Sequence, residues 1–262
     1  MHRYSGFLPQ PKASHNALRR LGVVLAIVVA GEGLALLVGR RGLLAVGPML
    51  IDSLLVGLLA AQALVPSAHA GPVRRASLET RRLDRYTRTS RVWAWRTMAA
   101  VAVVAVVAAG LTSNADGTSL TIGCPGPFGG GSGTVSPWPG FGYGASLLVA
   151  LVAGAALVEF ILAREVRRRR PDPARVAAAA DDLRRVATVR AALGTGLALA
   201  LFTGGEVAVA CFAELGSICA ATSRPAWLLP TSAALGLAGA ASIVAGILML
   251  VSSRLPWSRA WS

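Results

Sequence analysis

Six long apolar runs are the feature that most constrains the fold of this chain. A transmembrane helix needs about 20 mostly apolar residues to cross roughly 30 Å of hydrocarbon. Of all residues, 54% are hydrophobic and 15% are charged. The sequence therefore predicts an all-α, polytopic integral membrane bundle of six transmembrane helices. The predicted spans cover residues 21–39, 43–65, 92–112, 144–163, 191–213 and 231–252. Residues 1–20 and 253–262 are then terminal tails.

The third run is the shortest of the six. Its uninterrupted apolar stretch covers only residues 97–112. Val92, Trp93 and Trp95 extend it across Arg96, whose long side chain can reach toward the membrane interface. We therefore expect this run to span the bilayer as well.

Basic residues are distributed unevenly between the loops that the six spans would connect. Threading the chain from a cytoplasmic N-terminus places 23 of the 26 lysines and arginines on the cytoplasmic side, and only Arg40, Arg41 and Arg224 on the other. Short cytoplasmic loops of membrane proteins are enriched in Lys and Arg. The sequence therefore predicts that both termini are cytoplasmic. The excess of Arg over Lys and the abundance of Ala suggest a bacterial genome of high GC content, so we expect a multi-pass protein of the bacterial plasma membrane.

The formal net charge of +14 also raises nucleic acid as a partner. No nucleic-acid recognition motif accompanies this charge in the sequence. Membrane topology accounts for the arginines without one, so we expect no nucleic-acid binding.

The predicted outer loop, residues 113–143, contains no basic residue. The 24 residues 121–144 contain nine Gly and four Pro, which favour neither helix nor strand. Trp138, Phe141 and Tyr143 precede the fourth span, and aromatic rings favour the membrane interface. We therefore expect an irregular loop anchored at both ends.

All three cysteines fall on the predicted outer side. They are Cys124 in the long loop, Cys211 at the end of the fifth span and Cys219 in the last loop. Three pairings are open, and so is the alternative that all three thiols are unpaired. We expect a Cys124–Cys219 disulfide, because it would tie the two outer loops together and leave Cys211 in the membrane.

Two basic cytoplasmic segments have helical character. Residues 73–109 contain neither Gly nor Pro, so the third helix is expected to begin well before the bilayer. Asp172 and Pro173 resemble a helix start. After them, apolar residues recur at helical spacing. These apolar residues are Val176, Ala180, Leu183 and Ala187.

The arginines of these segments form a candidate interaction surface. Its members are Arg81, Arg85, Arg88, Arg184 and Arg185. Such clusters beside a span attract anionic lipid headgroups, and they would equally suit a cytosolic partner such as an ATPase subunit. The sequence leaves both readings open.

Acidic residues within the predicted spans are the second candidate site. Each costs about 2.5–3.5 kcal/mol near the bilayer centre on insertion scales. Glu32, Asp52 and Glu206 fall in the outer half of the membrane, whereas Glu159 lies near the cytoplasmic end, within reach of the headgroups or Arg164. The outer three either form a proton or cation site or act as separate protonated acids that donate hydrogen bonds between helices.

No catalytic, metal or cofactor motif emerges from the sequence. Residues 130–133 match the GxSG pattern of rhomboid proteases, but Ser132 lies in a loop and the sixth span lacks a histidine. The three histidines, His2, His15 and His69, lie far apart and outside the spans, so no histidine metal cluster is expected. We therefore expect no enzyme activity and no cofactor.

Two functional hypotheses remain. The first is a non-catalytic membrane component, an accessory protein or the membrane subunit of a transporter, that acts with a cytosolic partner through the basic segments. The alternative is a stand-alone proton- or cation-coupled carrier or channel that uses the intramembrane acids.

Overall fold

The computed structural model describes four long helices and one β-hairpin. It describes residues 55–57, 60, 86–126, 130–167, 175–219 and 224–254, with side chains described from residue 182 in the third of the long helices and up to residue 251 in the fourth. The elements are α3 (Thr89–Thr112), β1 (Leu120–Cys124), β2 (Gly131–Val135), α4 (Phe141–Arg167), α5 (Arg175–Ser217) and α6 (Leu228–Arg254).

Within these residues, four helices are long and apolar enough to cross a membrane. The predicted spans 92–112, 144–163, 191–213 and 231–252 lie inside α3, α4, α5 and α6, respectively, and are confirmed as helices. The chain therefore has the helices of a membrane protein. Span 21–39 lies outside the described residues, as does all of span 43–65 except residues 55–57 and 60, which are helical. The count of six spans and the side of the membrane on which each terminus lies therefore stay predictions.

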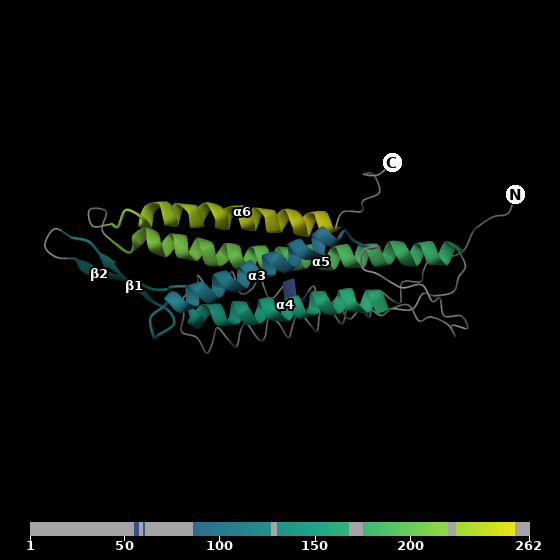
Figure 1. Cartoon of the computed structure of the whole chain (residues 1–262), viewed down its shortest axis with the longest axis horizontal. Helices are drawn as coiled ribbons and strands as arrows, with labels where there is room; N and C mark the ends of the chain where they lie inside the picture. The colour runs from purple at the N-terminus through teal and green to yellow at the C-terminus, as the bar shows by residue number, and fades with distance from the viewer. Residues whose placement is uncertain are drawn as a thin grey trace.

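The helices lie lengthwise beside one another, with the β-hairpin at one end (Figure 1). We call this the hairpin end, and the opposite end, where α3 and α5 begin and α4 ends, the arginine end. The central element is α5, which packs against α3, α4 and α6, whereas α6 packs mainly on α5. A buried apolar cluster around Trp95, Val158 and Leu199 fills the bundle toward the arginine end. A second cluster, around Val106, Trp138 and Leu215, fills it toward the hairpin end.

Glycines allow α5 and α6 to approach closely. A Cβ atom on Gly239 would lie 2.7 Å from the carbonyl oxygen of Gly205 and 3.0 Å from the backbone nitrogen of Val209. In the same way, a Cβ atom on Gly205 would lie 3.0 Å from the carbonyl oxygen of Gly239. Small residues of this kind permit backbone contact between membrane helices, which gain no hydrophobic driving force from association in lipid.

The hairpin is a correction to the expectation of a wholly irregular outer loop, and the fold is mostly helical rather than all-α. β1 and β2 pair antiparallel, with Leu120 opposite Val135. Both of these side chains are buried and belong to the cluster at the hairpin end, and the hydroxyls of Thr121 and Thr134 meet across the strands at 2.9 Å. A strand with one buried face needs few apolar residues. The high glycine and proline content of the loop therefore did not reveal the hairpin.

The helix α3 starts ahead of Arg96, and the residues directly before it are not helical. The helix begins at Thr89, and Arg88 before it is extended, with φ −66° and ψ 135°. The preceding residues, Tyr86 and Thr87, are buried. The absence of Gly and Pro from residues 73–109 permits a helix but does not enforce one, and packing of Tyr86 into the core turns the chain here. No continuous helix therefore runs through Arg88 into α3.

We expect the Gly239→Ala variant to be less stable than the wild type by about 1–3 kcal/mol, because the added methyl group has no room against α5. The matched control is Gly216→Ala in the last turn of α5, where an added Cβ would meet no atom within 4 Å. Thermal unfolding of the purified protein in detergent measures both. Equal midpoints for the two variants would contradict the close packing of α5 on α6.

Candidate functional site

An ion pair between α3 and α4 lies near the arginine end. Arg96 Nε donates to Glu159 Oε1 and Arg96 Nη2 donates to Glu159 Oε2, both at 3.0 Å. The two side chains are 49% and 43% exposed. The sequence predicts that Glu159 reaches the headgroups or Arg164 and that Arg96 reaches the interface, whereas the structure pairs the two side chains. Their shared position near the same end of antiparallel spans was the signal that could have paired them.

The pair marks a level along the bundle. The residues next to it, Trp95 and Val158, both contact Gly196 of α5: a Cβ on Gly196 would lie 2.7 Å from Val158 Cγ2 and 3.1 Å from the Trp95 ring. From Gly196 to the end of α5 at Ser217 the helix rises about 30 Å, at 1.5 Å per residue, which equals the thickness of the hydrocarbon core. Since charges are costly inside that core, we take the level of Arg96, Glu159 and Gly196 as one edge of the apolar slab and call it the charged layer.

Arginines gather beyond this layer, at the arginine end. The described arginines on that side are Arg88, Arg91, Arg164, Arg167, Arg175, Arg184, Arg185, Arg190 and Arg254. At the hairpin end, the described part of the chain has Arg224 with Asp116 and Glu214. The two ends of the bundle therefore differ strongly in charge.

The helix α5 extends far past the charged layer. Its 43 residues rise about 65 Å, and about 30 Å of this length lies beyond the layer. Its neighbour α4 ends at Arg167, only about 12 Å beyond. Figure 1 shows α5 continuing past the ends of α4 and α6. We call residues 175–190 the α5 extension.

Arg185 does not belong to the predicted surface, which is a correction. Its side chain is fully buried, and Nη1 donates to the backbone carbonyl oxygen of Glu165 at 2.9 Å. This carbonyl lies in the last turn of α4, where backbone acceptors lack helical partners and cations are favoured. Burial of the guanidinium is therefore offset by capping α4 and fixes α5 against it.

Of the other four predicted surface residues, two lie in the described part of the chain. Arg184 and Arg88 are exposed, Arg184 on the α5 extension and Arg88 just before α3. Arg81 and Arg85 lie outside the described residues. The structure thus assigns Arg184 and Arg88 to the arginine end on separate elements.

The predicted acidic site has one member in the described part of the chain. Glu206 lies on α5 about 15 Å from the charged layer, halfway across the apolar slab, and its Oε2 atom is shielded from solvent. Glu32 and Asp52 lie outside the described residues, so whether the three acids meet remains a prediction.

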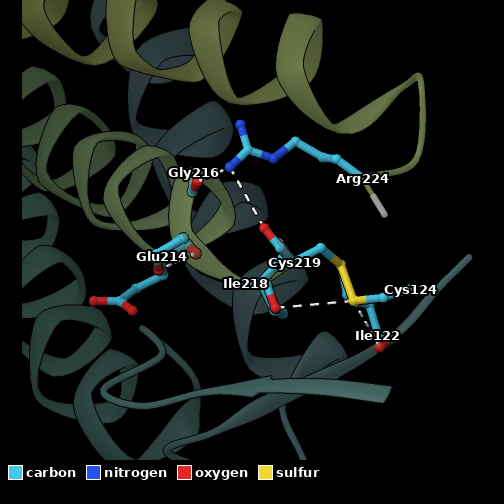
Figure 2. The surroundings of a disulfide bond; sticks show 8 residues. Ile122, Cys124, Glu214, Gly216, Ile218, Cys219 and Arg224 are labelled. Atoms are coloured by element: carbon cyan, nitrogen blue, oxygen red, sulfur yellow. Dashed lines mark hydrogen bonds between the residues drawn. A yellow bond between two sulfur atoms is a disulfide. The ribbon is translucent and has the colours of Figure 1, made fainter. Parts of the chain in front are cut away.

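Cys124 and Cys219 form a disulfide between β1 and the end of α5, with their Cα atoms 5.9 Å apart (Figure 2). Cys211 is a buried free thiol. Arg224 lies beside the bridge, and its Nη2 donates to the carbonyl oxygen of Gly216 at 2.9 Å, which satisfies an acceptor at the end of α5. This cluster ties the hairpin to the loop that follows α5.

Asp116 is the acidic residue of the turn before β1. Backbone N–H groups of Thr118 and Ser119 donate to its Oδ1 at 3.0 Å each. The bond from Thr118, followed by that from the Ser119 hydroxyl, holds the pKa of Asp116 below its ordinary value. These bonds stabilise the turn, and they give the Asp116 carboxylate hydrogen-bond partners without any ligand.

No family model, curated protein or solved structure matches the chain. Among the described residues, no group of three or more His, Cys, Asp or Glu side chains is arranged to hold a metal ion. The features of the described residues that bear on function are the charged layer, the α5 extension and the disulfide-linked hairpin end.

We expect removal of either partner of the Arg96–Glu159 pair to lower stability, since each leaves a charge at the edge of the apolar slab. A double-mutant cycle with Arg96→Gln and Glu159→Gln should give a coupling of about 0.5–1 kcal/mol, because both side chains are half exposed. Thermal unfolding in detergent or nanodiscs provides the four values. Strict additivity of the two substitutions would show that the pair does not couple α3 to α4.

Reduction should destabilise the hairpin end, because the bridge closes a loop of 95 residues. Loss of such a bond costs about 2–5 kcal/mol. Dithiothreitol should therefore lower the unfolding midpoint of the wild type and of Cys211→Ala, but leave Cys124→Ala unchanged. A midpoint for Cys124→Ala equal to that of the oxidised wild type would argue against any stabilising role of the bridge.

Proposed function

We propose that this protein is a non-catalytic component of the bacterial plasma membrane, an accessory protein or the membrane subunit of a transporter, that acts with a cytosolic partner. In this proposal the arginine end is cytoplasmic, in line with the positive-inside rule. The hairpin end, with its disulfide, then faces the oxidising side of the membrane, where such bonds persist.

The observation that carries the proposal is the length of α5. A helix that only crosses the bilayer needs about 20 residues, and α5 has 43. The α5 extension reaches about 30 Å past the charged layer, beyond the roughly 5–8 Å occupied by headgroups on each side of the core. A rigid helix that leaves the membrane at this height is suited to contact a protein in the cytosol.

The alternative, a stand-alone carrier or channel, has Glu206 in its favour. A carboxyl group halfway across an apolar slab is a default candidate for a proton or cation site. It is the weaker proposal, because it requires Glu32 and Asp52 to join Glu206.

The test is gentle purification from the native membrane at low and high ionic strength. The first proposal expects a cytosolic protein to copurify in stoichiometric amount and to dissociate in high salt, because the arginine end is basic. Recovery of the chain alone at every salt concentration would contradict it. In that event, proton or cation flux into liposomes that is lost in Glu206→Gln would support the alternative.

A further inference from the structure

The rotation of the α5 extension about its axis is set by Arg185. Because this side chain is buried and bonded to the end of α4, the opposite side of α5 must face outward. Residues two positions away lie about 160° around a helix, and residues four apart share a face. Leu183 and Ala187 therefore share the outward face, and both are exposed, Leu183 to 73%. The sequence continues this apolar stripe with Val176 and Ala180.

Lipid acyl chains do not reach the stripe. Leu183 lies about 20 Å beyond the charged layer along α5, whereas headgroups extend only about 5–8 Å beyond the hydrocarbon. If the edge of the slab lay at Arg164 and Arg190 instead, Leu183 would still be about 10 Å outside it. An exposed leucine at this height therefore faces the aqueous side.

Charge argues against this chain as its own occupant. The α5 extension carries four arginines against Asp181 and Asp182, so its net charge is positive. The other segments assigned to the cytoplasmic side are net positive as well. The N-terminal tail has four basic residues and no acidic one, and residues 74–85 have five arginines against Glu79 and Asp84. Docking one of these segments, or a second copy of the extension, would bring together surfaces of the same net charge, which is unfavourable at an interface. An acidic partner has the complementary charge.

We propose that the stripe of Leu183 and Ala187 docks, as one face of a helix, into an apolar groove with an acidic rim on a cytosolic protein. Apolar anchors at helical spacing give this mode its affinity, and the net positive charge of the α5 extension complements the acidic rim. The inference rests on the proposed function, since it names the surface through which the partner binds.

The experiment compares Leu183→Ala with Leu237→Ala, a matched leucine that is 75% exposed on α6, at the level of the apolar slab. Both variants are purified from native membranes, and the amount of copurified partner is measured per chain. A photo-crosslinking residue placed at 183, and at 237 as the control, then identifies the neighbours of each position. Unfolding midpoints equal to that of the wild type establish that both variants fold.

The expected result is a loss of partner by Leu183→Ala of about 10-fold or more, the effect of removing an interface anchor, with no loss by Leu237→Ala. Arg184→Glu should weaken binding and reduce its salt dependence, because it lowers the net positive charge of the α5 extension. The crosslink from position 183 should fall in a segment of the partner that contains both apolar and acidic residues, while position 237 crosslinks to lipid.

Three outcomes would overturn the inference. Lipid crosslinks at position 183 would show that the stripe lies in the membrane. A crosslink from 183 to another copy of the chain would make the stripe a self-association surface. A partner retained in full by Leu183→Ala would leave the proposed function standing and place its docking surface elsewhere, whereas the absence of any partner in the wild type would overturn the proposed function itself.

Discussion

The cost of placing a charge in hydrocarbon governs the arrangement of this molecule. Arg96 and Glu159 satisfy each other across two helices, and they do so at the edge of the apolar slab rather than inside it. Every other described arginine except Arg224 lies further toward the arginine end. The level of the Arg96–Glu159 ion pair thus separates the apolar part of the bundle, which suits lipid, from the arginine-rich part, which suits water.

The helix α5 connects these two parts. Within the slab it contributes the buried faces that pack on α3, α4 and α6. Beyond the slab it has no neighbour of equal length among the described helices, and buried Arg185, together with Val189 and Leu193, holds it against the bundle. Among the described helices, α5 is therefore both the central element of the bundle and the one that extends furthest at the arginine end.

Hydropathy predicted the four described spans well, because a run of about 20 apolar residues admits few structures other than a membrane helix. Two cysteines in predicted outer loops were enough to suggest the Cys124–Cys219 pairing. The sequence could not show which face of α5 turns inward: it assigned Arg185 to the candidate surface, yet Arg185 is buried and Leu183 is exposed. Helical spacing identifies faces, but the choice between them depends on tertiary contacts such as the carbonyl of Glu165. The hairpin was not predicted for a related reason. It is anchored by the burial of Leu120 and Val135, and two apolar residues are too few to give a recognisable strand pattern.

The disulfide has a mechanical consequence. It joins β1 covalently to the loop that begins just after Ser217, the last residue of α5, so sliding of α5 along the bundle axis is restrained at that end, and a tilt of the helix pivots near it. With a lever arm of about 65 Å, a tilt of only 5° or so displaces the start of α5 by about 6 Å. A small rearrangement where α5 packs on its neighbours therefore moves the first residues of α5 by several ångströms. Conversely, a force on these residues acts on the packed helices through the same long lever arm.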